Sequence, residues 1–328
     1  PVTLTSADDE KVYDGTALTN DEVTVGGEGF ATGEGATYDV TGTQTEVGSS
    51  ANAFSYILNE GMKADNYEIT KVEGTLTVTE MTAKVTVTIT ENSGSYMYDG
   101  AEHTASGYEV TNISNDLYKT GDFTFSGNDK VTGTDAGTYD MELKASDFTN
   151  NSKNFSNVEF VIVDGTLEIS KRSVTLTSAT QEKVYDGTAL TNNEVTVGGD
   201  GFADGEGASY DVTGTQTAVG SSANTFSYTL NEGTKAANYD ITTTAGTLTV
   251  TELTDKVTVT ITENSGSETY DGAEKTVTGY TVSIDNKLYT DADFTFSGKA
   301  TVKGTDAGTY NMELKASDFT NNSKNFSN

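Results

Sequence analysis

Residues 74–90 read GTLTVTEMTAKVTVTIT, and the alternation in this stretch decides the fold class. Apolar residues alternate with threonine on both sides of a short interruption. A period of two is typical of β-strands with one buried and one solvated face, and threonine is favourable in strands. Long stripes with helical periodicity are absent, and only residues 145–149 and 316–320 (both ASDFT) have helical potential. The sequence therefore predicts a mainly β protein.

A long internal repeat sets the domain organisation. The segment KVYDGTALTN at residues 11–20 returns at residues 183–192, and residues 2–80 align with residues 174–252 without a gap, differing at 15 of 79 positions. The tripeptide YDG occurs four times, at spacings of 85, 87 and 85 residues. A fixed period of this kind marks tandem modules. We therefore predict four small modules in the order A-B-A-B: residues 1–80 (A1), 81–171 (B1), 172–252 (A2) and 253–328 (B2).

Composition argues against several classes of function. The chain has 19 lysine and arginine residues against 50 aspartate and glutamate residues, and the net charge of −31 repels nucleic acid and anionic lipid. Without cysteine there is neither a thiolate metal site nor a cysteine nucleophile. The only histidine, His103, is replaced by Lys275 in module B2, and no stretch approaches the ~18 apolar residues of a membrane span. We expect a protein without enzymatic activity, cofactor, nucleic-acid partner or membrane insertion.

The YDG segments have two interpretations. Four regularly spaced tyrosines could form a repeated platform for sugars or peptides. In the alternative, the tyrosine packs at the edge of the core and the Asp-Gly pair makes the following turn. The scaffold interpretation is favoured because the segment occurs in both module types. The residues concerned are Tyr13, Asp14, Gly15, Tyr98, Asp99, Gly100, Tyr185, Asp186, Gly187, Tyr270, Asp271 and Gly272.

Two glycine-rich segments carry weak candidates for calcium ligands. They are VGGEGFATGEG at residues 25–35 and VGGDGFADGEG at residues 197–207. Calcium takes six to eight oxygen ligands, but the spacing fits neither an EF-hand loop nor the GGxGxD nonapeptide. Thr32 of the first copy is also replaced by Asp204 in the second. We favour a hairpin loop without metal; the weak candidates are Glu28, Glu34, Asp200, Asp204 and Glu206.

The order of motifs resembles the MBG ("mostly β-grasp") and YDG-type tandem repeat families. The resemblance is strongest in KVYDGT (residues 11–16) and NYEITKVEGTLTV (residues 66–78) of module A1, and looser in YDGA, DAGTY and VDGTLEI of module B1. It implies β-grasp-like modules and a place in large secreted or surface-anchored bacterial proteins, often as stalks of adhesin-like molecules. It implies no catalytic or binding residues. Because DAGTY also matches the turn-then-tyrosine corner of β-sandwiches, an Ig-like sandwich is the alternative fold.

Three hypotheses about function follow. Short joints without glycine favour a monomeric, elongated rod on the order of 140 Å, a spacer that holds binding domains lying outside this chain. Alternatively, the repeats form a multivalent array that binds glycan or protein. The third hypothesis starts from VEFVIVDGTLEIS at residues 158–170, which has no counterpart in module B2. We favour the interpretation that the A-B pattern continues after Asn328 and supplies this segment; in the alternative, a module open on that side could be completed by strand addition from another chain, as a fibre subunit.

Overall fold

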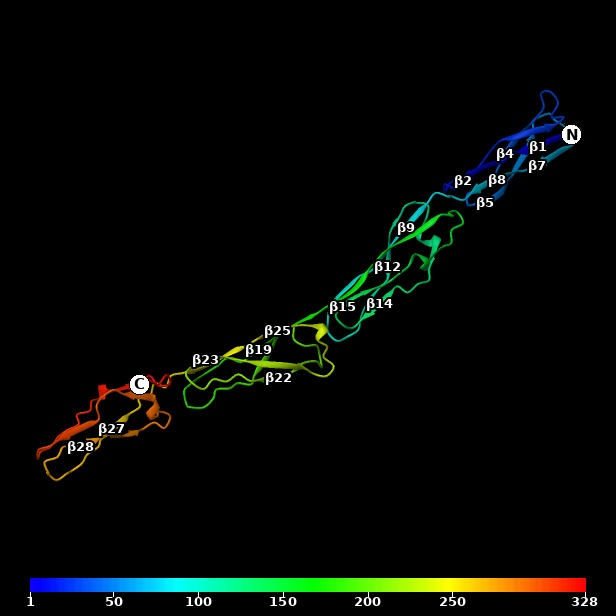
Figure 1. The fold of residues 1–328 in the computed structure, drawn as a ribbon. Coiled ribbons are helices and arrows are strands. Elements are labelled where there is room, and N and C mark those ends of the chain that lie inside the picture. The colour runs from blue at the N-terminus through cyan, green and yellow to red at the C-terminus, as the bar shows by residue number, and fades with distance from the viewer. The chain divides into compact units, whose positions relative to one another are not determined.

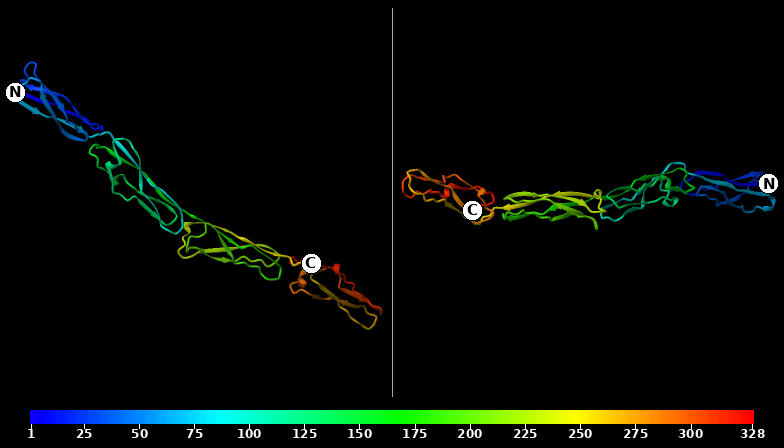
Figure 2. Two further views of the ribbon diagram at one scale, coloured as in Figure 1. Left: turned by 180° about the vertical axis from the view of Figure 1, so that it is seen from behind. Right: turned by 60° about the horizontal axis from the view of Figure 1, so that its bottom comes forward.

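The computed structural model describes residues 1–328, and the chain divides into two compact units, Pro1–Ser170 and Lys171–Asn328. Both units consist of short strands joined by turns (Figures 1 and 2). The prediction of a mainly β protein is thereby confirmed. The further division of each unit into an A and a B module stays a prediction from the repeat, and we keep these names for the residue ranges given above.

All helical elements are 3-10 turns of three residues, and none is long or apolar enough to cross a membrane. Two of them, η3 (Ala145–Asp147) and η6 (Ala316–Asp318), lie in the two segments with helical potential. The others are η1 (Ala64–Asn66), η2 (Thr120–Asp122), η4 (Ala236–Asn238) and η5 (Asp291–Asp293).

Module A1 contains two three-stranded sheets and one two-stranded antiparallel sheet. The first sheet has the order β3-β1-β7, the second β2-β8-β5, and β4 pairs with β6. In both three-stranded sheets the central strand has one antiparallel and one parallel neighbour. The strands are β1 (Val2–Ser6), β2 (Asp9–Val12), β3 (Val23–Gly27), β4 (Ala36–Val40), β5 (Gly48–Asn52), β6 (Phe54–Leu58), β7 (Ile69–Val72) and β8 (Gly74–Thr79).

The core of module A1 follows the alternation in the sequence. In β1 and β8 every second residue is buried, and threonine occupies most positions between. Val2, Leu4 and Phe54 are at most 3% exposed, and Tyr38 and Ile69 pack against them. Burial of a side chain of this size stabilises the fold by about 1.5–3 kcal/mol. The residues that alternate with threonine are therefore the buried ones, as the period of two in the sequence predicts.

Gly74, the glycine of the GTL motif, lies where two segments of the chain pass from the first three-stranded sheet into the second. β1 runs parallel to β7 in the first sheet, and β2 runs parallel to β8 in the second. The segments β1–β2 and β7–β8 therefore pass side by side from the first sheet into the second. A Cβ at Gly74 would lie 2.4 Å from the carbonyl oxygen of Ser6, so no other residue fits. The buried Ser6 hydroxyl donates to the carbonyl of Asn52 (2.6 Å) and accepts the Gly74 N–H (2.9 Å).

Module B1 has the same plan with one more two-stranded sheet. β9 lies between antiparallel β12 and parallel β17, and β18 lies between parallel β10 and antiparallel β15. The two-stranded antiparallel sheets are β11–β14 and β13–β16. The strands are β9 (Val85–Glu91), β10 (Gly94–Met97), β11 (His103–Ser106), β12 (Tyr108–Ile113), β13 (Phe123–Phe125), β14 (Lys130–Gly133), β15 (Gly137–Asp140), β16 (Phe148–Asn150), β17 (Val158–Val163) and β18 (Thr166–Ser170).

Module B1 has the same passage between its two three-stranded sheets. There the Glu91 carboxylate accepts the glycine N–H, as the Ser6 hydroxyl does in module A1. Glu91 is 3% exposed and accepts the N–H groups of Leu143 (2.6 Å) and Gly165 (2.7 Å). The residue before Leu143 is Glu142, whose φ of 62° lies in the left-handed region that non-glycine residues rarely adopt. A Cβ at Gly165 would lie 2.6 Å from the Asn92 carbonyl oxygen, so this crossing also requires glycine.

The second unit repeats the plan of module A1 in residues 172–252. Its three-stranded sheets have the orders β21-β19-β25 and β20-β26-β23, and β22 pairs with β24. These strands are β19 (Arg172–Ser178), β20 (Gln181–Val184), β21 (Val195–Gly199), β22 (Ala208–Val212), β23 (Gly220–Asn224), β24 (Phe226–Leu230), β25 (Tyr239–Thr244) and β26 (Gly246–Thr251).

Residues 253–328 form three two-stranded sheets, β27–β29, β28–β31 and β30–β32. The segments that correspond to β10 and β15 of module B1, residues 266–269 and 308–311, are not strands here. The strands are β27 (Val259–Glu263), β28 (Lys275–Thr278), β29 (Tyr280–Ile284), β30 (Phe294–Phe296), β31 (Thr301–Gly304) and β32 (Phe319–Asn321).

Candidate functional site

The YDG segments of the A modules form charged turns. One carboxylate oxygen of Asp14 accepts hydrogen bonds from the backbone N–H of Thr16 (2.9 Å) and from Lys11 Nζ (2.7 Å). The hydrogen bond from Lys11, with those from Thr16, holds the pKa of Asp14 well below its usual range. Gly15 has a φ of 78°, which favours glycine in the turn. Asp186 makes the same contacts with Lys183 and Thr188.

The B modules make a related turn with a different cation. Asp99 accepts the N–H of Ala101 (2.9 Å) and lies 2.9 Å from His103 Nε2, and these two contacts lower its pKa in that order. In module B2, Asp271 instead pairs with Lys275 Nζ at 2.7 Å, and this bond is the main cause of its lowered pKa. His103 and Lys275 thus occupy equivalent places beside a turn carboxylate.

The tyrosine of the first YDG segment lies at a contact between modules A1 and B1. The Tyr13 ring makes an edge contact with Phe155, with 5.6 Å between centroids, and Tyr118 contacts the same phenylalanine at 5.3 Å. All three side chains are at most 8% exposed. Burial, together with Asp122, raises the pKa of Tyr118 to about 12. Aromatic pairs of this kind contribute about 0.5–1.5 kcal/mol beyond the area that they bury.

Hydrogen bonds fix the same contact. Asn154 Oδ1 accepts the backbone N–H of Val47 (2.9 Å), and Asn154 Nδ2 donates to the Glu46 carboxylate. Met81, at the start of module B1, donates its N–H to the Asn154 carbonyl (2.9 Å) and forms a parallel bridge with Phe155. Backbone and side chain of the Asn-Phe pair therefore hold both modules at once.

Gly15, in the turn that follows Tyr13, also lies against module B1. A Cβ at this position would lie 2.7 Å from Leu117 Cδ2 of module B1. The glycine of YDG therefore serves a positive φ and a close approach at the same time. We call the set Tyr13, Gly15, Val47, Leu117, Tyr118, Asn154 and Phe155 the A–B joint.

The second unit contains the same A–B joint in different residues. Tyr185 and Tyr289 contact Phe326 at 5.6 and 5.2 Å, and Asn325 Oδ1 accepts the N–H of Val219 (2.9 Å). A Cβ at Gly187 would lie 2.6 Å from Leu288. One contact differs, since Glu46 of the first unit is replaced by Ala218. An Asn-aromatic pair recurs in each module, at residues 66–67, 154–155, 238–239 and 325–326, but the sequence analysis did not identify it as a contact between modules.

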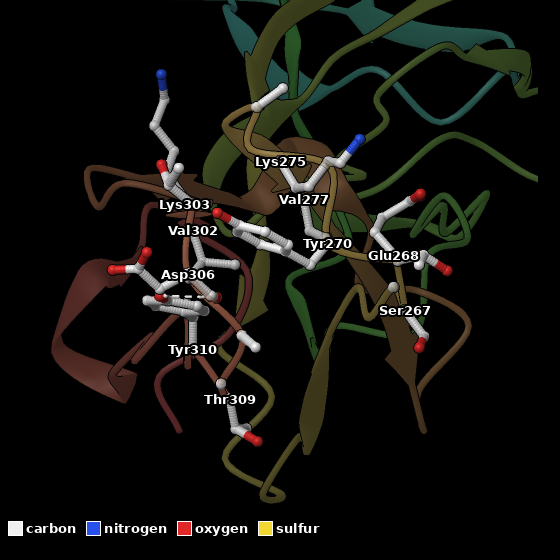
Figure 3. A pocket seen from close by; sticks show the side chains of 17 residues that line it. Ser267, Glu268, Tyr270, Lys275, Val277, Val302, Lys303, Asp306, Thr309 and Tyr310 are labelled. Carbon is white, nitrogen blue, oxygen red and sulfur yellow. Dashed lines mark hydrogen bonds between the residues drawn. The ribbon is translucent and has the colours of Figure 1, made fainter.

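In the B modules the YDG tyrosines have different surroundings. Tyr98 is 3% exposed, whereas Tyr270 is 65% exposed and lines a cavity together with Tyr310 (Figure 3). The Tyr310 hydroxyl donates to the Asp306 carbonyl at 3.1 Å, as the turn-then-tyrosine pattern predicts. Tyr139 makes the same bond in module B1, to Asp135 at 2.9 Å. The twelve YDG residues therefore do not form one repeated aromatic platform.

Four of the five weak candidates for calcium ligands contact neighbouring groups of the protein instead. Glu34 accepts a hydrogen bond from the Tyr67 hydroxyl, and Glu206 accepts one from Tyr239 at 2.7 Å. The carboxylate of Asp200 accepts the N–H of Ser173 (3.1 Å). Glu28 lies 3.9 Å from the amino group of Pro1, and Asp204 is in the same loop as Asp200 and Glu206. No three His, Asp or Glu side chains lie close enough together to hold a metal ion.

Comparison with known proteins gives one family. A family model for the MBG domain matches residues 83–171 and 256–327, and no curated protein matches the chain. We expected the closer resemblance in the A modules, but the matched segments are the B modules. Residues 83–171 and 256–327 are therefore similar to the MBG domain family.

Proposed function

We propose that the chain is a structural spacer without enzymatic activity, part of a secreted or surface-anchored bacterial protein. The observation that carries this proposal is the A–B joint, which recurs with the same geometry around Phe155 and Phe326. An enzyme requires one active site, whereas a spacer requires equivalent connections between successive modules. The similarity of residues 83–171 and 256–327 to the MBG domain, a repeat domain of surface proteins, supports the same conclusion.

Bending between modules A1 and B1 is limited by aromatic side chains buried in the A–B joint, not by the length of the linker. Phe155 is 2% exposed, so separating module A1 from module B1 would expose it together with Tyr13. Exposing such side chains costs roughly 1.5–3 kcal/mol each. The net charge of −31 adds repulsion that disfavours collapse and self-association. A spacer in an aqueous, crowded environment needs both properties.

A multivalent binder receives less support. Repeated binding would need equivalent exposed side chains in successive modules. Tyr96 is 40% exposed and stacks on His103, but its counterpart in module B2 is Glu268. Ile57 is the most exposed large apolar residue of module A1, and its counterpart is Thr229. These two exposed positions do not repeat, and the exposed large apolar residues that do repeat are aliphatic: Val12 and Val184, Val25 and Val197, Leu117 and Leu288.

Small-angle X-ray scattering tests the spacer proposal. Two successive short strands span each module, as β1 and β2 do over residues 2–12, and four such spans at ~3.3 Å per residue predict an extended particle on the order of 140 Å with a radius of gyration of about 40 Å. A compact globule of this length would have a radius of gyration of about 20 Å. The variant Phe155→Ala with Phe326→Ala should show increased flexibility in the scattering curve. A radius of gyration near 20 Å for the unmodified chain would contradict the proposal.

A further inference from the structure

The first strands of module A1 pair directly with its last strands. β1 pairs in parallel with β7, and β2 pairs in parallel with β8 (Figure 1). We call β1, β2 and the residues between them the entry segment, and β7, β8 and the residue between them the exit segment. Val2 at the start of the entry segment lies opposite Ile69, and Val12 at its end lies opposite Thr79. The two segments are therefore paired along their whole length.

Modules B1 and A2 repeat this arrangement. In module B1, β9 pairs in parallel with β17 and β10 with β18, and in module A2, β19 pairs with β25 and β20 with β26. The YDG tyrosine that follows the entry segment donates its N–H to the last residue of the exit segment, in the pairs Tyr13–Thr79 (2.8 Å), Tyr98–Ser170 (2.9 Å) and Tyr185–Thr251 (2.9 Å). The tyrosine backbone thus closes the pairing in all three modules.

Side chains connect the two segments of module A1 where they pass between the sheets. The Ser6 hydroxyl accepts the N–H of Gly74 at 2.9 Å, and the carboxylate of Asp8 accepts the N–H of Thr75 at 2.7 Å. Both bonds lie between the β1–β7 pair and the β2–β8 pair. Two successive N–H groups of the exit segment are therefore bonded to the entry segment at the place that neither strand pair covers.

Modules B1 and A2 make the same two side-chain bonds with different residues. The bonded pairs are Glu91–Gly165 (2.7 Å) and Ser93–Thr166 (3.1 Å) in module B1, and Ser178–Gly246 (2.9 Å) and Thr180–Thr247 (3.1 Å) in module A2. The first acceptor is a serine or a glutamate, and the second is an aspartate, a serine or a threonine. The feature that the three modules share is thus the bond between the two segments, not the residue that makes it.

This pairing determines how a module responds to a pull on the chain. Tension enters the module at the start of the entry segment and leaves it at the end of the exit segment. Because the segments are parallel, these two points lie at opposite ends of the pair, and the pull is directed along the strands. The bonds between parallel strands lie across that direction, so all of them resist the pull together. Two adjacent ends pulled apart would instead break the bonds one after another.

We propose that modules A1, B1 and A2 resist tension in shear, so that the chain is a tether that carries a pulling force as well as a spacer that sets a distance. The entry and exit segments carry the force. The residues between them, 13–68 in module A1, lie outside its path. The use of this property in a surface protein rests on the proposed function, whereas the resistance itself rests on the strand pairs and their side-chain bonds.

Magnetic tweezers at constant force test the proposal on module A1 within the full chain. Since the chain has no cysteine, Pro1→Cys with Glu80→Cys attaches the handles for pulling in shear. Pro1→Cys with Glu68→Cys attaches them at adjacent ends, because the Val2 N–H donates to the Glu68 carbonyl at 2.8 Å. At a force of about 30 pN, we expect the folded module to last at least ~100-fold longer in shear. Release of roughly 250 Å of chain identifies the unfolding of module A1.

Variants of the exposed Asp8 test the side-chain bonds. Asp8→Ala should shorten the lifetime in shear about tenfold, because a hydrogen bond to a charged acceptor is lost. It should leave the lifetime at adjacent ends unchanged, because the bonds nearest the handles break first there. Asp8→Thr, which copies Thr180 of module A2, should retain most of the lifetime in shear. The matched control is Ser49→Ala, which removes a hydroxyl contact between β5 and the exit segment and should have no effect.

The possible results separate this proposal from the spacer proposal. Equal lifetimes in the two pulling geometries would overturn resistance in shear. Equal shortening by Asp8→Ala in both geometries would overturn the role assigned to the side-chain bonds. A short lifetime in shear, together with an extended particle in small-angle scattering, would contradict the tether and leave the spacer intact. A long lifetime in shear with a compact particle would support the tether and contradict the spacer.

Discussion

At the residue scale, the YDG segment shows how three adjacent residues serve different neighbours. Asp14 organises its own turn, Gly15 makes room for Leu117, and Tyr13 packs against Phe155 of the next module. The turn follows from local chemistry, because aspartate accepts the N–H two residues later and glycine adopts a positive φ. For this reason the sequence predicted the turn. The partner of the tyrosine depends on a residue far along the chain, which no local rule predicts.

The aspartates of the A modules should make stability depend on acid. Their folded-state pKa lies below the ordinary value of about 3.9, so the stabilisation is complete above that pH and is lost as the pH falls through the folded-state pKa. We expect Asp14→Asn with Asp186→Asn to lower the melting temperature at pH 7. The difference from the unmodified chain should shrink steadily below about pH 4.

Thermal unfolding followed by circular dichroism between pH 2 and pH 7 measures this effect. Asp39→Asn, on the exposed face of β4, is the control for loss of one negative charge. A melting-temperature difference that stays constant across this pH range would show that the turn carboxylates do not act through their charge.

At the element scale, the alternation of apolar residues and threonine was sufficient to predict strands, but not their order in the sheets. β1 and β7 pair although most of module A1 separates them in the chain, and both then cross into a second sheet. Pairing of distant strands depends on the whole core, whereas alternation is a property of each strand alone. The glycine of GTL was visible in the sequence, but its role at the crossing required the approach of Gly74 to Ser6.

The A–B joint was the least predictable element for the same reason. Its hydrogen bond between Val47 and Asn154 connects residues 107 positions apart. The sequence did contain a signal, since an Asn-aromatic pair recurs at the same place in each module. A repeated pair shows that a position is part of the frame, but it does not show whether the side chains face the same module or the next.

A double-mutant cycle on the joint should measure its coupling energy. Phe155→Ala should destabilise the first unit by about 3–5 kcal/mol, because the ring is almost fully buried. Combined with Tyr13→Ala, it should show a coupling of about 0.5–1.5 kcal/mol, since both changes remove the same ring contact. Urea unfolding followed by tyrosine fluorescence gives these values.

The chain itself offers the control for this cycle. Glu46→Ala copies the residue that the second unit has at position 218, where the joint forms without a carboxylate. It should change the free energy of unfolding by less than about 1 kcal/mol. Strictly additive effects of Tyr13→Ala and Phe155→Ala would mean that the two rings do not couple the modules.

At the scale of the whole molecule, the repeat indicated tandem modules, and the composition argued against several classes of function. The contacts show which neighbouring modules are held together. The absence of cysteine and the strong negative charge argued against several chemistries without naming a function. The strands of one module could be read from one stretch of sequence, while the connection between modules could not. The central claim is therefore that module A1 and module B1 move as one body, because the joint around Phe155 holds them together.

Pulsed electron spin resonance tests this claim most directly. Since the chain contains no cysteine, Asp39→Cys on β4 and Glu109→Cys on β12 place one spin label on each module without further changes. We predict a single narrow distribution of distances between the labels in the otherwise unmodified chain. The added change Phe155→Ala should broaden it. A distribution that is already broad in the chain with an intact joint, and no broader after Phe155→Ala, would contradict the account.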